Sequence, residues 1–190
     1  MCGIVGYIGK SQVQPILLDG LERLEYRGYD SAGIAVYDGT DIQVMKCKGK
    51  LKNLAEKLEG HGLAGCLGIG HTRWATHGAP SDNNSHPHIS EDLKFAVVHN
   101  GIIENYLDIK EELIKSGFSF HTETDTETVT CLIDSFYRQG LSFVDAVFAA
   151  VKKLRGAYAL GILCQDCPDT LIAVRKDCPC LLYTSFPAAS

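Results

Sequence analysis

Two kinds of apolar pattern alternate along the chain, and together they predict its elements. Compact runs rich in β-branched, aromatic and aliphatic residues are typical of strands and occupy 4–8, 32–36, 42–45, 67–69, 95–98, 157–163 and 171–174. Apolar residues three or four positions apart are typical of amphipathic helices and occupy 16–24, 51–58, 106–113, 129–136 and 147–154. Helices and strands in comparable number predict an α/β or α+β domain, and periodicity alone leaves both open.

Turn and cap residues indicate where several of these elements begin. Asp38-Gly39 predicts a tight turn between two strands, and the last two strands form a second predicted hairpin. Ser11-x-x-Gln14 and Thr124-x-x-Glu127 have the form of capping boxes, so a helix is expected to start at each. The polar stretch 72–91 is too long for a turn, and such loops in compact domains are usually functional or disordered.

Composition fits one ordinary globular domain. The 190 residues are little more than the ~150 that serve as a prior for one domain, and no repeat or linker divides them. A net charge of −5 gives no basic surface for nucleic acid or an anionic membrane. No signal peptide is visible, and the longest apolar run, at 156–164, is far shorter than the ~18 residues of a membrane span. We therefore expect a cytoplasmic protein with its eight cysteines as thiols.

Cys2 is the first candidate for chemistry. Removal of Met1 would leave one residue that carries both a thiol and a free α-amine. The amine, with an ordinary pKa of about 7.7–8.0, can accept the proton of a thiol whose pKa is about 8.5. Nucleophile and base would then belong to a single residue. Position alone favours the alternative, a buried thiol at the start of a strand.

A second candidate cluster opens the long polar stretch. Arg73 has the planar fork that captures a carboxylate through two hydrogen bonds. Trp74 offers a flat apolar cover, and Thr76 and His77 add polar contacts. The alternative is a surface loop with a cation–π pair, but the grouping of these residues between glycines modestly favours function.

Two further candidates follow strands or caps. Asn100-Gly101 ends the strand at 95–98, where a side-chain amide beside a glycine N–H could form an oxyanion hole. Asn-Gly is also a strong hairpin signal, although the helical pattern that follows weakens that reading. Asp125 could pair with the ammonium group of a ligand. At the start of a helix, however, an acidic residue is favoured whatever its function.

Metal binding is the less favoured alternative. Cys164-x-x-Cys167 and Cys178-x-Cys180 could supply four thiolates to zinc, but the second spacing is unusual. His71, His77, His86 and His88 are close in sequence without a standard ligand pattern. We therefore interpret the cysteines as structural thiols and the histidines as polar loop residues.

Several motifs in this order resemble one family, the glutaminase domains of glutamine–fructose-6-phosphate aminotransferases, which are class II glutamine amidotransferases. The resemblance covers residues 2 to about 176 and rests on CGIVGY at 2–7, LEYRGYDSAG at 24–33, GHTRWATHG at 70–78, SHPH at 85–88, VHNGIIEN at 98–105 and ETDTE at 123–127. Each motif alone is weak, but the ordered set is specific. Tyr29 and Trp74 fit this family better than amidophosphoribosyltransferase or asparagine synthetase domains.

The resemblance implies a fold, an activity and a set of roles. The fold is the N-terminal nucleophile type of α+β domain, a four-layer αββα sandwich of two antiparallel sheets between helices. The activity is hydrolysis of L-glutamine to glutamate and ammonia, with no cofactor and no metal. By this resemblance, Cys2 is the nucleophile, and Asn100 and Gly101 form the oxyanion hole. The residues implied in substrate binding are Arg73, Trp74, Thr76, His77 and Asp125. Arg27 is implied to support the turn beside the nucleophile.

Two departures from the family concern the C-terminal side. Family members continue into sugar isomerase (synthase) domains that make glucosamine 6-phosphate, and these are absent here. Residues 178–190 do not resemble the family, so the expected organisation is a glutaminase domain at 2–177 followed by an atypical tail. A glutamine-binding remnant without catalysis, an amidophosphoribosyltransferase-like glutaminase and a zinc-binding structural domain remain as alternatives.

Overall fold

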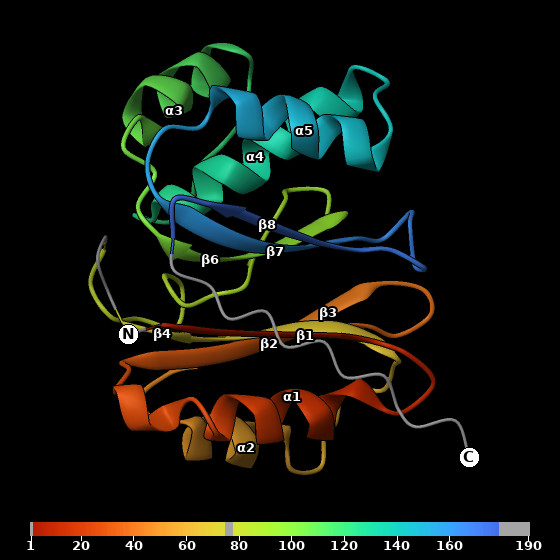
Figure 1. Cartoon of the computed structure of the whole chain (residues 1–190). Coiled ribbons are helices and arrows are strands. Elements are labelled where there is room, and N and C mark those ends of the chain that lie inside the picture. Colours follow the sequence, from red (N-terminus) through yellow and green to blue (C-terminus); the bar gives the residue numbers. More distant parts are fainter. Residues whose placement is uncertain (1, 75–77, 179–190) are drawn as a thin grey trace.

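The computed structural model describes residues 2–74 and 78–178 as four layers, with two stacked sheets between two helical layers (Figure 1). One sheet has the order β1-β4-β2-β3 and the other β5-β6-β7-β8, and every neighbouring pair is antiparallel. The first sheet comprises β1 Gly3–Ile8, β2 Ser31–Tyr37, β3 Ile42–Lys48 and β4 Leu67–Arg73. The second comprises β5 His88–Ile89, β6 Phe95–Gly101, β7 Tyr158–Cys164 and β8 Leu171–Lys176. This arrangement confirms the predicted α+β sandwich.

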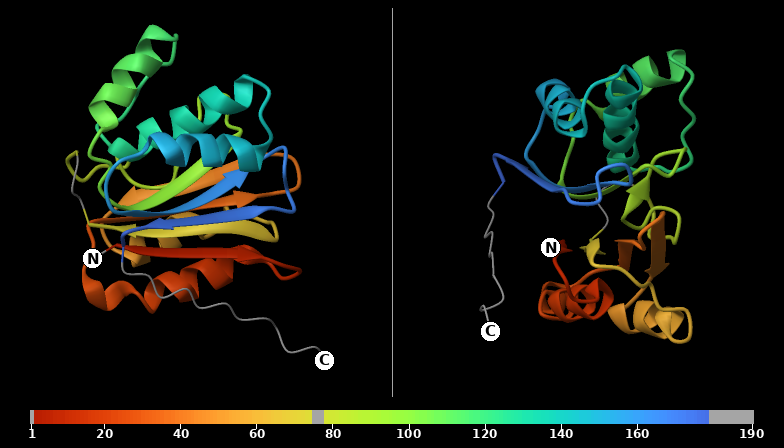
Figure 2. Two further views of the ribbon diagram at one scale, coloured as in Figure 1. Left: turned by 45° about the horizontal axis from the view of Figure 1, so that its top comes forward. Right: turned by 90° about the vertical axis from the view of Figure 1, so that its right-hand side faces the viewer.

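The helices divide between the two outer faces, as Figure 2 shows from two further directions. On the first sheet lie α1 Val13–Glu22 and α2 Leu51–Leu58, and the one-turn helix η1 Glu25–Arg27 follows α1. Over the second sheet lie α3 Tyr106–Lys115, α4 Asp125–Arg138 and α5 Phe143–Lys153. Within the described residues, no helix combines the length and apolar character needed to cross a bilayer.

Three buried apolar clusters join the four layers. One lies between α1, α2 and the first sheet and includes Leu17, Ile34 and Leu54. The cluster between the two sheets includes Ile69 and Val98, both fully buried. A larger cluster joins the second sheet to its helices. The middle cluster explains why strands such as β4, inside the sandwich and under helices, are buried at every position.

Both predicted helix starts are confirmed, since α4 begins at Asp125 and α1 at Val13, but the capping box is present only at α4. Thr124 caps α4 by accepting the N–H of Glu127. Helix α1 instead begins after Gln12, which makes no side-chain cap. The side-chain oxygen of Gln14 accepts the N–H of Leu63. It therefore does not reach back to the backbone N–H at the start of the helix, as it would in a capping box. Both predicted hairpins, β2–β3 and β7–β8, are confirmed.

The polar stretch is partly ordered by the protein itself. It contains the two-residue strand β5, which the pattern did not predict. The Lys46 ammonium, on β3, donates to the carbonyl oxygens of Asn83, Ser85 and Pro87 at 2.8–3.3 Å. This cation therefore fixes the segment against the first sheet.

The cluster between the sheets predicts a large cost for truncation at its centre. Ile69→Ala removes buried methylene groups between two rigid sheets, so the free energy of unfolding should fall by about 2–5 kcal/mol in urea titrations. Val144→Ala, at a position 45% exposed on α5, should change it by less than ~0.5 kcal/mol. Similar losses in both variants would contradict the assignment of a core between the sheets.

Candidate active site

The candidate residues meet at one end of the sandwich, where strands of both sheets begin or end. The pairs Gly3–Thr72 and Ser31–Arg73 bring the starts of β1 and β2 to the end of β4. From the second sheet, Asn100 at the end of β6 donates through Nδ2 to the carbonyl oxygen of Cys2 at 3.3 Å. Residues 98 positions apart are thereby in contact.

The Cys2 thiol is half-buried between backbone groups of Trp74. The Trp74 N–H donates to Sγ at 3.1 Å, and the thiol lies 3.5 Å from the Trp74 carbonyl oxygen, to which it can donate. Burial raises the pKa of the Cys2 thiol, and the nearby Asp30 carboxylate adds to this, while the Trp74 N–H and the Arg73 charge oppose it. Formation of the thiolate therefore requires a nearby proton acceptor.

Asn100 and Gly101 occupy positions with strong backbone constraints. Gly101 has φ of 114°, and a Cβ there would lie 2.2 Å from the carbonyl oxygen of Ala157. Only glycine fits this close approach to the start of β7. The Asn100 side chain is fixed at both ends, because Oδ1 lies 2.8 Å from Nε2 of His71 while Nδ2 reaches Cys2.

Arg73 is almost fully buried at the end of β4. Its Nη2 donates to the Gly78 carbonyl oxygen at 3.1 Å, and its Nη1 lies 3.9 Å from the Asp30 carboxylate. Burial lowers the pKa of the guanidinium, and the charges of Asp30, Cys2 and Asp125 oppose that shift. The guanidinium therefore lies in the electrostatic field of both the thiol and Asp125.

Asp125 lies in the first turn of α4 and is 3% exposed. Its Oδ2 accepts the N–H of Ile103 at 2.9 Å, and its Oδ1 lies 3.6 Å from Nδ1 of His99. The helix dipole also favours a carboxylate at this position. The structure thus holds the buried Asp125 carboxyl group beside the segment that follows β6.

Trp74, Arg27, Thr76 and His77 are less fully defined. Trp74 is 55% exposed, and its ring lies over Gly28, where a Cβ would come within 3.0 Å of it. Thr76 and His77 lie outside the described residues. Arg27 ends η1, and its side chain is also outside the described part.

The interpretation of the histidines as polar loop residues was wrong for His71 and His88, which lie on β4 and β5, whereas His86 lies in the loop but is buried. His71, His86 and His88 are at most 5% exposed, and His99 on β6 joins them. The ring of His86 stacks on that of His71 at 4.4 Å and meets that of His88 edge-on at 4.9 Å. Burial lowers the pKa of His71 to about 3 and those of His86 and His88 well below the usual range. His77 lies outside the described residues.

These histidines form a buried hydrogen-bond network beside the candidate residues. Thr126, on α4, bonds to both His86 and His99, and Thr124 bonds to His88. The sequence signal for burial was the strand assignment itself, since His99 directly follows the apolar run at 95–98 and His71 follows the run at 67–69 after one glycine. Over 2–74 and 78–178, no group of three or more His, Cys, Asp or Glu side chains is arranged to hold a metal ion.

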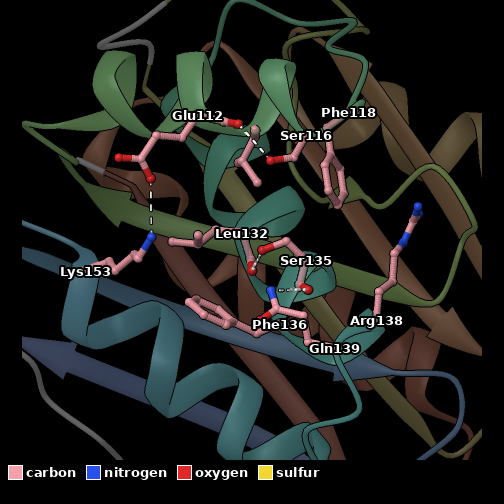
Figure 3. A pocket seen from close by; sticks show the side chains of 10 residues that line it. Glu112, Ser116, Phe118, Leu132, Ser135, Phe136, Arg138, Gln139 and Lys153 are labelled. Atoms are coloured by element: carbon pink, nitrogen blue, oxygen red, sulfur yellow. Dashed lines mark hydrogen bonds and ion pairs between the residues drawn. The ribbon is translucent and has the colours of Figure 1, made fainter.

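A separate cavity of about 350 Å³ lies among α3, α4 and α5 (Figure 3). Its wall includes Phe118, Phe136 and an ion pair between Lys153 and Glu112 at 3.2 Å. It contains none of the candidate residues. The cavity therefore belongs to the outer helical layer and not to the candidate site.

Comparison with known proteins agrees with the geometry. The glutamine amidotransferase domain family matches residues 71–183, more than half of the chain. The chain belongs to this family. Within it, the chain is 54% identical over 182 residues to glutamine–fructose-6-phosphate aminotransferase [isomerizing] of Clostridium tetani, and 55% identical over 183 residues to that of Symbiobacterium thermophilum.

The amidotransferase likeness extends to solved structures. Glutamine phosphoribosylpyrophosphate amidotransferase from B. subtilis superimposes with a TM-score of 0.74 at 30% identity, over 87% of this chain and 35% of that one. The match to the two aminotransferases covers 96% of this chain but 30% of theirs. The chain therefore spans less than a third of the length of these relatives.

The backbone constraint at Gly101 predicts a specific sensitivity. In the amidotransferase chain, Gly101→Ala should lower the free energy of unfolding by more than ~2 kcal/mol, because a collision with Ala157 adds to the ~1–2 kcal/mol cost of positive φ. Gly117→Ala, at φ of 92° with no atom within 4 Å of a Cβ, should show only the cost of φ. If denaturant titrations showed the same loss of unfolding free energy in Gly101→Ala and Gly117→Ala, the predicted collision with Ala157 would be refuted.

Proposed function

We propose that this chain hydrolyses L-glutamine to L-glutamate and ammonia, with Cys2 as the nucleophile once Met1 has been removed. The observation that supports this most strongly is the direct contact of the Cys2 backbone with the Asn100 amide, beside the Gly101 N–H. A thiol and two potential oxyanion donors in one place are what acyl transfer needs.

The free α-amine of Cys2 supplies the base that the thiol requires. Because burial raises the thiol pKa, the amine takes the thiol proton as Sγ attacks the side-chain carbonyl carbon of glutamine. Asn100 Nδ2 and the Gly101 N–H stabilise the oxyanion of the tetrahedral intermediate. The C–N bond then breaks, and the amine returns the proton to the leaving ammonia. Water attacks the resulting thioester and releases glutamate and the free thiol.

The remaining candidates recognise the amino-acid end of glutamine. Arg73 binds the α-carboxylate with help from Thr76 and His77, and Asp125 binds the α-ammonium. The opposite charges of Arg73 and Asp125, each at most 4% exposed, match a zwitterion in a small pocket. Trp74 covers the bound substrate and helps to lead ammonia onward, while Arg27 supports the turn beside the nucleophile.

The larger reaction requires parts outside this chain. The relatives are named as aminotransferases of fructose 6-phosphate, and this chain covers 30% of their length. We infer that the chain is the glutaminase half of such an enzyme, which makes glucosamine 6-phosphate when synthase domains accept the ammonia. Alone, it releases ammonia to water. The chemistry uses thiol, amine and amide groups, with no cofactor.

Identity distinguishes this assignment from its nearest competitor. The chain is 54–55% identical to the two aminotransferases but 30% identical to the phosphoribosylpyrophosphate amidotransferase. The fructose-6-phosphate group is therefore favoured. A remnant that binds glutamine without turnover is the other alternative, and calorimetry beside an activity assay separates the two.

Removal of the thiol tests the nucleophile. In chain whose loss of Met1 is verified by mass spectrometry, Cys2→Ala should reduce glutamate production to background, since no other group forms the thioester. Cys66→Ala removes another half-buried thiol and should leave the rate within about twofold. Glutamate production that survives Cys2→Ala would refute the mechanism.

Substrate recognition should respond to charge at Asp125. Asp125→Asn keeps the shape but loses the charge that pairs with the substrate ammonium, so KM for glutamine should rise at least about tenfold, with a smaller effect on kcat. Asp108→Asn alters an exposed aspartate in the first turn of α3 and should leave KM unchanged. An unchanged KM in Asp125→Asn would assign that carboxylate a purely structural role.

A further inference from the structure

The orientation of the Asn100 amide decides whether an oxyanion hole exists. One end of this side chain donates hydrogen bonds and the other only accepts them. The proposed reaction needs Nδ2 on the side of Cys2, because an oxyanion is repelled by the amide oxygen. A rotation of 180° about the last side-chain bond would replace the donor by an acceptor at nearly the same position. The site therefore needs a device that prevents this rotation.

Two contacts select the productive orientation. Nδ2 donates to the Cys2 carbonyl oxygen at 3.3 Å, and Oδ1 lies 2.8 Å from Nε2 of His71. In the reversed amide, Oδ1 would face the Cys2 carbonyl, which is another acceptor. The contact with Cys2 is long and lies beside the group that reacts, whereas the contact with His71 is short. His71 is thus the stronger of the two restraints.

The His71 ring is itself held firmly. It lies on β4, is fully buried and stacks on His86 with an angle of 24° between the rings. The groups around it are Asn100 and His99 from β6, His86 from the loop, and Arg73 two positions along its own strand. None of them is an anion, and burial holds the pKa of His71 near 3. A neutral ring has one N–H to donate, and the acceptor Oδ1 requires it at Nε2.

We propose that His71 is a positioning residue for this glutaminase: its Nε2–H holds Oδ1 of Asn100, so that Nδ2 stays directed at the developing oxyanion. This inference rests on the proposed function and adds a residue to it. His71 acts through Asn100 and does not touch the substrate. Its loss should affect the tetrahedral state far more than the bound ground state.

Two substitutions at His71 separate the hydrogen bond from packing. His71→Leu fills much of the ring volume and removes the donor, whereas His71→Gln keeps an N–H donor near the position of Nε2. Removal of an oxyanion donor costs ~10²–10³ in kcat, and loss of its restraint should cost less. We therefore expect His71→Leu to lose about tenfold or more in kcat with KM changed less than about threefold, and His71→Gln to recover most of the rate.

A matched control lies in the same cluster. His88 is also buried, but its ring bonds to Thr124, whereas the Asn100 amide bonds to His71 and Cys2. His88→Gln should lower stability while kcat stays within about twofold. An aldehyde analogue of glutamine, which forms a tetrahedral hemithioacetal with Cys2, should bind His71→Leu at least about tenfold more weakly, while glutamate should bind it as it binds the unmodified chain.

Nuclear magnetic resonance of protein labelled with nitrogen-15 in histidine and asparagine gives a readout that does not depend on turnover. It should report His71 as the neutral Nε2–H tautomer throughout about pH 5–8, and the Asn100 amide as a single rotamer that becomes mobile in His71→Leu.

The outcomes for His71 and for the proposed function are distinguishable. An Nδ1–H tautomer, or an Asn100 amide that stays fixed in His71→Leu, overturns the inference even if glutamine is hydrolysed. If the unmodified chain lacks Met1 and does not hydrolyse glutamine, the proposed function is overturned. The His71 tautomer and the Asn100 rotamer then still show whether His71 holds the Asn100 amide. Equal kcat in His71→Leu and the unmodified chain also overturns the inference that His71 positions Asn100.

Discussion

The antiparallel pairing of β1 with β4 is the constraint on which the candidate site depends. Its register sets Gly3 opposite Thr72, so the residue before β1 lies beside the residues that end β4. The thiol of Cys2, the backbone of Trp74 and the guanidinium of Arg73 come together for this reason. The second sheet then adds Asn100 through one hydrogen bond to the Cys2 backbone. The placement of the candidate residues at this end of the sandwich thus depends on strand register more than on any loop.

Burial shapes the electrostatics of the same region. Burial holds the pKa values of His71, His86 and His88 below the usual range, and the charge of Arg73 adds to this, so these three rings stay neutral. They bond instead to hydroxyl and amide groups, including those of Thr126 and Asn100. Arg73 lies beside the Asp30 carboxylate, and Asp125 accepts the N–H of Ile103. Arg73 and Asp125 thus provide a cation and an anion where the zwitterionic substrate is proposed to bind.

Sequence predicted much of this fold because local patterns and family motifs agreed. Strand runs, both hairpins, the Thr124 cap and the four-layer class are confirmed, since each depends on local spacing or on the ordered motifs. The helix start near Ser11 to Gln14 was right, but its capping box is not formed, and the Gln14 side chain binds Leu63, about fifty residues away.

What the pattern missed were mainly tertiary contacts. The buried histidines were missed because polar letters in a long segment resemble a surface loop, and only the closing of the sandwich buries them. The catalytic and binding roles, together with the domain boundary at 177, stay predictions. The sequence could not show that Asn100 Oδ1 meets His71, because that contact crosses from one sheet to the other.

The short distance between Cys2 and the first strand has a consequence for changes in chain length. Gly3 is already paired in β1, and Cys2 is fixed by Trp74 and Asn100, so no slack separates the thiol from the sheet. An insertion or deletion of a single residue here would turn every following side chain of β1 to the opposite face or carry the thiol away from Asn100. In this segment the spacing of residues is therefore under as strict a constraint as their identity.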